Sequence, residues 1–250
     1  MMKFFYLALV AFLLSGCMGK APITNRDQIL LMSPSEEIAL GTQGYAAFLK
    51  TAKLSTDRVQ VARVRSIGQK IAIAANKPNY KWEFNVVDDK QINAFCMPGG
   101  KVVVYTGILD LVKNDDQLAT IMSHEVAHAL ARHGAERMSH QKISSGVQLL
   151  GNLILGQTAP QYTNTFNTAY GYGTKYGVML PYSRSHEYEA DEIGVHLMYK
   201  AGYNIQEAVN FWKIMKAMKG NAPTEFLSTH PNDDNRILKI AQTIKKIEKK

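Results

Sequence analysis

The chain has 250 residues, 46% of them hydrophobic and 20% charged, a balance that excludes general disorder and suits one globular domain with short appendages. Its formal net charge is +8, but the basic residues are scattered and no aromatic-rich basic motif accompanies them. We interpret the charge as a soluble surface with some attraction to anionic lipid. Nucleic acid is not an expected partner.

The first residues have the pattern of an export signal. Met1 to Lys3 supply a short basic start, and the apolar run from Phe4 to Leu14 is too short to span a membrane. The run ends in Leu14-Ser15-Gly16-Cys17, which resembles the bacterial lipobox, where cleavage before the cysteine leaves it as the lipid-bearing first residue. We therefore expect a signal peptide in residues 1–16 and a lipidated tether in residues 17–32.

Lipidation of Cys17 has two further consequences. Cys96 is then the one remaining cysteine, so no internal disulfide is expected and the core alone must stabilise the domain. Met18 stands where lipoproteins retained in the inner membrane usually carry Asp, which favours the outer membrane. The predicted location is a membrane lipoprotein that faces the periplasm, in the outer rather than the inner membrane.

The folded domain is expected to occupy residues 33–250. Helical patterns over residues 35–52 and 57–75 predict two scaffold helices. Two runs rich in aromatic and β-branched residues, 80–87 and 102–105, predict short strands. The first half of the domain is therefore a mixture of helices and a small sheet.

The second half is predicted to be mainly helical. A helix should run from Asp115 to about Met138, with acidic residues at its positive end. Residues 144–182 are rich in Gly, Asn, Thr and Tyr and are expected to form a helix end and a mobile covering loop. Helical patterns return over 185–199 and 205–218, and an amphipathic helix closes the chain. The predicted fold class is α+β, mostly α-helical.

A metal-binding motif lies inside the predicted helix that begins at Asp115. His124-Glu125-Val126-Ala127-His128 places two imidazoles at i and i+4, on one face of a helix and within reach of a single zinc ion. Zinc acidifies a water molecule, and Glu125 beside the histidines can take its proton as a general base. Two ordinary histidines on a helix are the alternative interpretation, which the spacing and the helical context disfavour.

A catalytic zinc site needs a third protein ligand and one open position. The pattern with a third histidine close behind the motif would require His at position 134, which is Gly134. His133 and His140 are therefore not expected to be ligands.

The better candidate for the third ligand is a downstream acidic segment. Glu187 and Asp191 are spaced i, i+4 on one face of a predicted helix, so one carboxylate can bind the metal while the other orients a ligand histidine. Glu189 should point elsewhere, and His186 is expected to be a solvated residue at the helix start. A charged helix surface is the alternative interpretation of the two acids.

Taken together, these residues resemble the zinc-peptidase family that includes the HtpX membrane proteases, the CAAX prenyl proteases and a branch of periplasmic lipoproteins. The resemblance covers about residues 33–239. It rests on five blocks in order, namely Ser33-Pro34-Ser35-Glu36-Glu37-Ile38-Ala39-Leu40-Gly41, Asn93-Ala94-Phe95 with Pro98-Gly99-Gly100 and Tyr105-Thr106-Gly107, His124 to His128, Ser183-Arg184 with Glu187 and Asp191, and Ser228-Thr229-His230-Pro231 with Arg236. The transmembrane helices of HtpX and the helical-repeat tail of larger lipoprotein members are not expected in this chain.

The resemblance implies a gluzincin-like domain with a small sheet beside the active-site helix, one zinc ion per chain, and roles for individual residues. Glu187 would be the third ligand, Asp191 would orient a ligand, and Glu125 would be the general base. His230 would approach the zinc, and Arg236 would stabilise the oxyanion.

The resemblance also implies where a substrate binds. Asn93, Ala94 and Phe95 would lie on a strand edge that pairs with an extended peptide, while Cys96 is interpreted as a packing residue. The expected function is a zinc-dependent endopeptidase that degrades misfolded or misassembled proteins of the bacterial cell envelope and is held to the membrane through Cys17. The alternative hypothesis is a chaperone-like or assembly lipoprotein with a latent zinc site, gated by residues 144–182 and His230.

Overall fold

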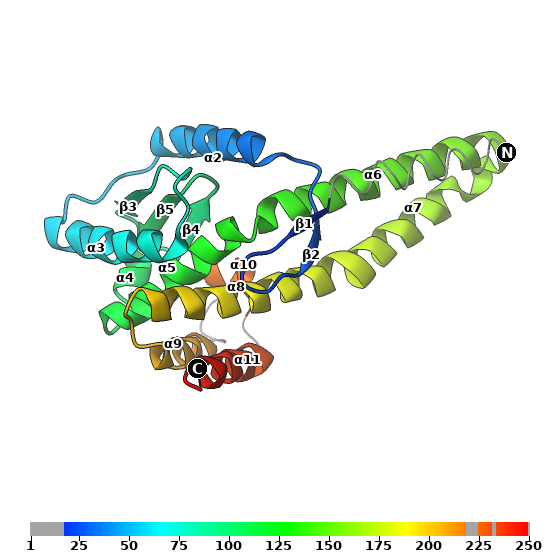
Figure 1. The fold of residues 1–250 in the computed structure, drawn as a ribbon. Coiled ribbons are helices and arrows are strands. Elements are labelled where there is room, and N and C mark those ends of the chain that lie inside the picture. The colour runs from blue at the N-terminus through cyan, green and yellow to red at the C-terminus, as the bar shows by residue number, and fades with distance from the viewer. Residues whose placement is uncertain (1–17, 219–224, 232–233, 250) are drawn as a thin grey trace.

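The computed structural model describes residues 18–218, 225–231 and 234–249, and most of them are helical. The helical elements are α2 (Pro34–Leu49), α3 (Arg58–Ala75), α4 (Thr106–Leu109), α5 (Asp115–Leu130), α6 (His133–Thr158), η1 (Pro160–Tyr162), α7 (Thr163–Tyr172), η2 (Gly173–Met179), α8 (Leu180–Lys200), α9 (Gln206–Ala217), α10 (Glu225–Thr229) and α11 (Asp234–Ile247). The strands are β1 (Met18–Lys20), β2 (Asp27–Ile29), β3 (Glu83–Val87), β4 (Ala94–Met97) and β5 (Lys101–Tyr105). This composition agrees with the predicted class, and Figure 1 shows the arrangement.

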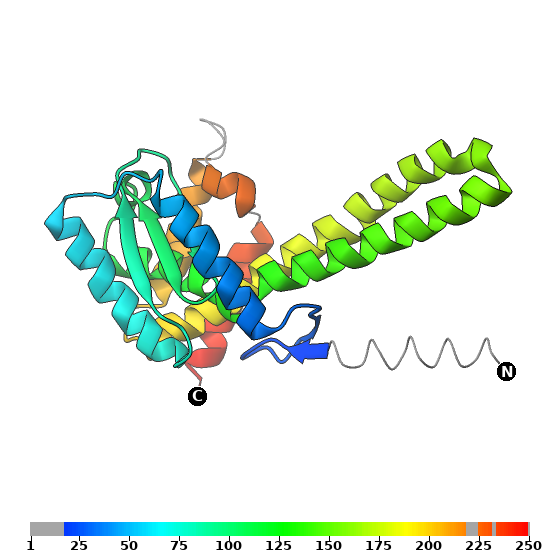
Figure 2. The same cartoon turned by 90° about the horizontal axis from the view of Figure 1, so that it is seen from above.

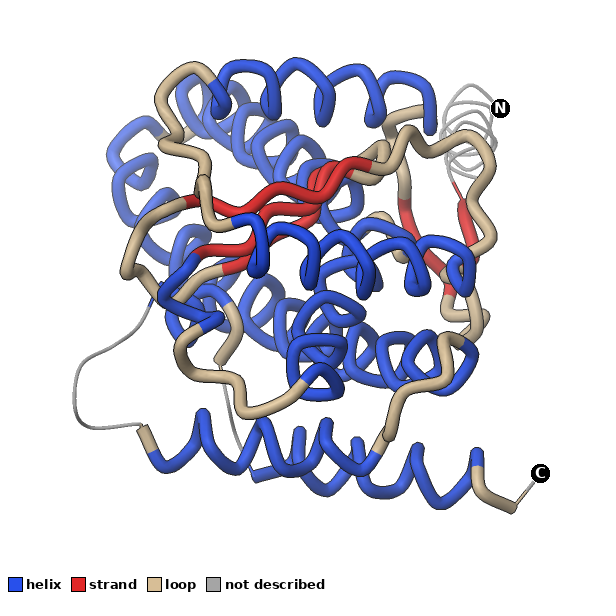
Figure 3. The backbone as a smooth tube through the Cα atoms, turned by 90° about the vertical axis from the view of Figure 1, so that its left-hand side faces the viewer, coloured by secondary structure: helices blue, strands red, loops and turns tan. Residues whose placement is uncertain are grey.

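The larger sheet has three strands in the order β3-β5-β4. β3 and β5 are parallel, with Phe84 opposite Val102, whereas β4 and β5 are antiparallel, with Ala94 opposite Val104. All of β5 is buried, and helices pack on both sides of the sheet (Figure 3). β4 lies at one edge of the sheet, next to α5.

Side chains at the helix starts explain why the predicted helices begin where they do. Ser33 and Glu36 form a capping box at the start of α2, and the Asp57 side chain accepts hydrogen bonds from the first turn of α3. The Asn114 side chain accepts from the backbone N–H of Gln117 at the start of α5. These contacts satisfy backbone donors that a helix cannot pair by itself.

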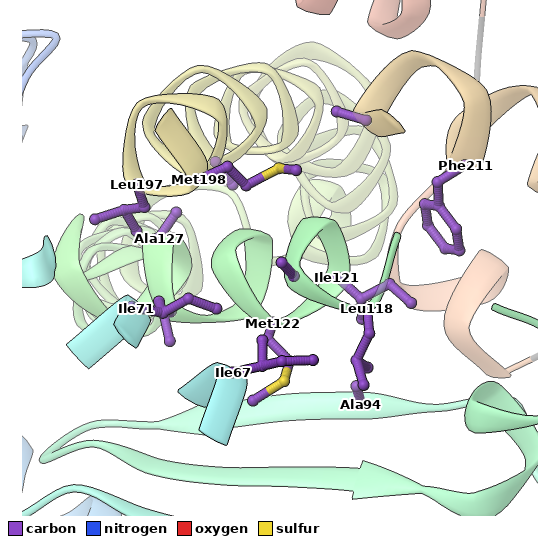
Figure 4. Packing of buried hydrophobic residues seen from close by; sticks show 14 of the residues in the cluster. Ile67, Ile71, Ala94, Leu118, Ile121, Met122, Ala127, Leu197, Met198 and Phe211 are labelled. Carbon is purple, nitrogen blue, oxygen red and sulfur yellow. The ribbon is translucent and has the colours of Figure 1, made fainter. Parts of the chain in front are cut away.

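The helix α5 lies at the centre of the core, with the sheet on one side and α8 on the other (Figure 4). Large apolar side chains from α3, α5, α8 and α9 pack around it, including Ile67, Ile71, Leu118, Ile121, Met122, Leu197, Met198 and Phe211. Gly194 on α8 allows the close approach, because a Cβ there would lie 3.2 Å from the backbone nitrogen of His124. The core therefore fixes α5 and α8 against each other.

Two of the expectations for the second half are wrong. The helix expected to run from Asp115 to Met138 is divided, because Arg132 has a left-handed backbone (φ 55°) that ends α5 and redirects the chain into α6. Residues 144–182 form a long helical hairpin with α6 as one limb and α7, η2 and the start of α8 as the other. The hairpin extends away from the rest of the protein (Figure 2).

The folded part begins earlier than the predicted boundary at Ser33. β1 and β2 pair antiparallel within the segment expected to be a tether. The Gln28 side chain then donates to the carbonyl oxygen of Ala131, 2.6 Å away, and the Leu31 backbone donates to Ser139 Oγ at 2.9 Å. The N-terminal strands are thus attached to the base of α6.

The predicted signal peptide (residues 1–16) and Cys17 lie outside the described residues. Among the helices that the structure describes, none combines the length and the apolar composition that crossing a membrane requires.

Candidate active site

Two histidines of α5 meet at the centre of the candidate site. His124 and His128 are one helical turn apart, and their Nε2 atoms are separated by 3.1 Å. His124 is almost completely buried, and His128 faces a cavity. The helical spacing therefore brings the two imidazoles together as the sequence predicted.

Glu187 reaches the same point from α8. Its carboxylate oxygens lie 3.4 Å from His124 Nε2 and 3.4 Å from His128 Nε2. His230, which follows α10, adds a third ring: its Nδ1 is 3.2 Å from His124 Nε2 and 3.1 Å from Glu187 Oε2. Four side chains from three separate segments thus converge.

The four side chains fit a zinc ion. Each offers one ligand atom, and these atoms all lie within 4.8 Å of one another. A tetrahedral ion about 2.0–2.1 Å from each donor would separate the donors by roughly 3.3–3.4 Å, which matches most of the observed separations of 3.1 to 3.4 Å. Three imidazoles and one carboxylate are also a donor set that zinc prefers.

The charge around Glu187 also suits a cation site. Burial alone would raise the pKa of Glu187, but His128, His124 and His230 lower it well below its ordinary value. The carboxylate is therefore ionised at neutral pH. An ionised carboxylate that faces three imidazole rings in a buried site is a ready ligand for a metal ion.

Asp191 and Arg236 lie behind this cluster. Asp191 Oδ1 is 2.9 Å from His124 Nδ1, on the side of the ring away from Glu187, as expected for a carboxylate that orients a ligand histidine. Arg236 forms two hydrogen bonds to Asp191, at 2.7 and 2.8 Å, and its Nη1 is 3.0 Å from Glu187 Oε2. The guanidinium is fully buried and lies 3.7 Å from the centre of the Trp212 ring.

This position differs from the oxyanion-stabilising role that the resemblance implied for Arg236. Its remaining donor group points to the backbone carbonyl oxygens of His230 and Pro231, at 3.4 and 3.2 Å. All three nitrogens of the guanidinium are thus engaged with the protein. In the arrangement seen here Arg236 connects Asp191, Glu187 and the segment that carries His230.

Glu125 is also buried beside the cluster. Its Oε1 is 3.4 Å from His230 Nε2, and burial raises the pKa of Glu125 above its ordinary value. A carboxylate with a raised pKa is better suited to accept and return a proton near neutral pH than an exposed one. Glu125 therefore lies beside the candidate ligands, and its role as general base stays a prediction.

A second chain of contacts, which sequence reasoning missed, supports His128 from behind. His128 Nδ1 is 2.8 Å from His133 Nδ1, and His133 Nε2 is 2.9 Å from Glu189 Oε2. Arg26, from the turn between β1 and β2, binds both Glu189 and Glu136 at 2.7 Å. The hydrogen bonds can all run in one direction, from His128 through His133 to Glu189, which leaves His128 Nε2 unprotonated towards the cluster.

Three residues set aside by sequence reasoning are therefore part of the site's surroundings. His133 and Glu189 are buried in this chain of contacts, and burial lowers the pKa of His133 to about 4. His186, which we expected to be solvated, is buried and stacks on His133 with ring centres 4.0 Å apart. Arg26 lies in the expected tether, so no local pattern in the sequence identified it.

A cavity of about 360 Å³ opens beside the cluster. His128, Glu187 and His230 line one side of it, and Asn93, Ala94 and Phe95 line the side formed by β4. The edge strand and the candidate ligands thus line the same cavity.

Cys96 also lines this cavity, from β4. Burial raises the pKa of its thiol, so the thiol stays protonated at neutral pH and is a poor nucleophile. This agrees with a packing role.

Known proteins are similar to this chain over most of its length. The profile of Peptidase family M48 matches residues 59–244. Mitochondrial metalloendopeptidase OMA1 of Saccharomyces cerevisiae is 34% identical, over 95% of this chain and 74% of the yeast protein. The OMA1 of Schizosaccharomyces pombe is also 34% identical, over 88% of this chain and 65% of its own length. Beta-barrel assembly-enhancing protease of Escherichia coli K12 is 29% identical over 82% of this chain. The matched part is only 43% of the length of that relative.

Proposed function

From its membership of peptidase family M48, which makes it a zinc metallopeptidase, we propose a more specific function for the chain. It is an endopeptidase of the bacterial cell envelope that degrades misfolded or misassembled proteins. One observation carries the proposal: His124, His128 and Glu187 converge beside a cavity that the edge strand β4 also lines. A strand edge binds an extended polypeptide through main-chain hydrogen bonds at any point along its length. This suits cleavage of internal bonds in unfolded chains.

The proposed roles follow from the positions of the side chains. His124, His128 and Glu187 hold one zinc ion, which when bound would supply a Lewis acid that polarises the scissile carbonyl. Glu125 accepts a proton from the attacking water. The water oxygen adds to the carbonyl carbon, the carbon–nitrogen bond breaks, and the proton held by Glu125 passes to the leaving amine. Asn93, Ala94 and Phe95 hold the substrate backbone next to this group.

His230 and Arg236 are assigned supporting roles. His230 Nδ1 lies where a fourth donor would close the zinc coordination, whereas catalysis needs one open position. His230 is therefore proposed to withdraw when a substrate enters. Arg236, bound to Asp191 and Glu187, is proposed to be a positioning residue that keeps His124 and Glu187 in place.

The cellular part of the proposal rests on two supports. The N-terminal pattern before Cys17 is typical of a bacterial lipoprotein signal, which favours the envelope and attachment to a membrane, the outer rather than the inner one. The relative from E. coli is named a beta-barrel assembly-enhancing protease. Misassembled envelope proteins are therefore the proposed substrates.

The contact between His230 and the cluster also favours a second candidate function, a chaperone-like lipoprotein whose zinc site is latent. One pair of variants separates the two functions, assayed on an unfolded protein with zinc content measured in parallel. Glu125→Gln should retain zinc but lose cleavage, and His230→Ala should cleave at least as fast as wild type. If wild type and His230→Ala both fail to cleave while zinc is bound, the peptidase proposal is wrong and the latent site is favoured.

A further inference from the structure

The long helical hairpin has a distal part with an unusual distribution of side chains. Residues 143–174, from α6 to the start of η2, contain no Asp, Glu, Lys or Arg, and residues 137–186 contain no acidic residue at all. We call residues 143–180 the arm, because they extend away from the domain (Figure 2).

Large apolar side chains of the arm point outwards. Five of them on α6 are between 50% and 62% exposed, namely Val147, Leu149, Leu150, Leu153 and Ile154. On the returning limb Tyr162, Tyr172 and Val178 are also exposed. Single exposed apolar residues are common, but a group this large on one element indicates a binding surface.

Several of the contacts between the two limbs of the arm are polar. Gln148 donates to the Asn167 side chain at 2.9 Å, and the Tyr170 hydroxyl donates to the Ser144 carbonyl oxygen, also at 2.9 Å. The two limbs are close at Gly151, where an added Cβ would collide with the ring of Phe166. Small residues and polar contacts between the helices, with aliphatic side chains outside, are the arrangement of helices that pack within lipid.

We infer that the arm inserts into the surface of an anionic lipid bilayer. The charge pattern favours lipid over a second copy of the chain. Arg137 and Lys142 precede the uncharged segment 143–174, Lys175 and Arg184 follow it, and residues 137–186 contain no acidic residue. Such flanking basic residues attract anionic headgroups, whereas two copies would bring like charges together.

The length of the arm sets the depth of insertion. The uncharged part of α6, residues 143–158, is about 24 Å long at 1.5 Å per residue, less than the hydrocarbon thickness of about 30 Å. The arm therefore lies in the headgroup region and the outer acyl chains without crossing.

The described chain also enters the domain at the base of the arm. β1 begins at Met18, and the segment after β2 is bound to α6 through Leu31 and Ser139. An anchor before Met18 and the arm would thus approach the same membrane. The inference rests on the proposed envelope location, but its test reads the arm alone.

A polarity-sensitive fluorophore on an introduced cysteine tests the insertion. We would use the full chain with Cys17→Ser and Cys96→Ala, and label Leu153→Cys. The matched control is Val59→Cys on α3, where Val59 is 79% exposed. Vesicles of phosphatidylethanolamine and phosphatidylglycerol would carry a quencher on their acyl chains. Because the readout is local, other contacts that hold the chain on the vesicle do not affect it.

The inference predicts a blue shift and strong quenching at position 153 and neither at position 59. Leu149→Lys combined with Leu150→Lys should lower the affinity for vesicles, measured by quenching at position 153, about tenfold or more, which corresponds to about 1.4 kcal/mol. Ile73→Lys on α3 should leave this affinity unchanged. A solvent-like signal at position 153 with vesicles would overturn the inference. A blue shift that needs only higher protein concentration would also overturn it, in favour of a second copy.

Cleavage of a soluble unfolded protein without vesicles separates this inference from the proposed function. The double-lysine variant should cleave as fast as wild type, because the substituted residues are far along the arm from the zinc ligands. If wild type itself does not cleave, the proposed peptidase function fails and the labelling result still decides the inference about the arm.

Discussion

Replacing His133 with Phe should weaken zinc binding although His133 is not a proposed ligand. The phenyl ring can keep the stacking on His186, but it removes the acceptor that lies 2.8 Å from His128 Nδ1 and the donor that lies 2.9 Å from Glu189. Glu189 keeps Arg26 as a partner, so the main loss is the hydrogen bond that fixes the orientation and tautomer of His128. Loss of such a partner typically lowers metal affinity by about 10- to 100-fold, which is about 1.4–2.8 kcal/mol.

The assay is competition for zinc against a chromophoric chelator of known affinity, with thermal unfolding of the metal-free protein measured alongside. One buried donor left without a partner should cost about 1–3 kcal/mol in unfolding free energy. His140→Phe is the matched control, because His140 lies on the same helix, seven residues further on, and is less buried than His133. A His133→Phe variant with wild-type zinc affinity would refute the reasoning.

Three further predictions follow from particular contacts. Gly194→Ala should destabilise the protein by about 1–3 kcal/mol in chemical unfolding, because its Cβ would lie 3.2 Å from the backbone of His124. The control Gly156→Ala on α6 should be neutral or stabilising, because a Cβ there meets nothing within 4 Å. Equal effects of the two substitutions would contradict the packing argument. Burial would raise the pKa of Glu189, but hydrogen bonds from His133 and Arg26 outweigh this effect and lower the pKa from 4.5 to about 2. The stability advantage of wild type over Glu189→Gln should therefore be complete above pH 4.5 and disappear as the pH falls towards about 2. An advantage that does not change across this pH window would exclude the ion pair as its source. Removal of zinc with a chelator should lower the unfolding free energy by about 2.7 kcal/mol, relative to protein in free zinc at about 100 times its dissociation constant. An unchanged unfolding midpoint would show that zinc does not bind the folded state.

The predictable part of the site is the part encoded by local spacing. His124 and His128 at i and i+4 must share a helix face, and Glu187 and Asp191 have the same relation on α8. The scaffold helices were also predictable, because their first residues carry capping side chains such as Ser33 and Asp57. Such signals act within one or two helical turns, so the sequence displays them directly.

The contacts behind His128 could not be predicted in this way. Arg26 and Glu189 are 163 residues apart in the chain, and nothing near Arg26 resembles a structured segment. His133 was set aside because it does not have the spacing of a ligand, yet its role is to hold a ligand. Interactions of this kind depend on how distant segments pack, which local patterns do not contain.

Residues 144–182 were predicted to be a helix end and a mobile loop for a different physical reason. Gly, Asn and Thr have low helix propensity, and the apolar residues of α6 do not face the core, so the usual amphipathic pattern of a surface helix is absent. On the inferred contact of the arm with the membrane surface, these apolar side chains face lipid, and the expectation drawn from globular proteins does not apply.

Two histidines from α5 and a carboxylate from α8 are proposed to hold one zinc ion. The most direct test is the zinc content of the purified chain and of Glu187→Gln after dialysis against a weak chelator, measured by mass spectrometry together with cleavage of an unfolded protein. We expect one zinc per wild-type chain, and loss of both metal and cleavage in Glu187→Gln. A Glu187→Gln protein that keeps its zinc and cleaves at the wild-type rate would contradict this proposal.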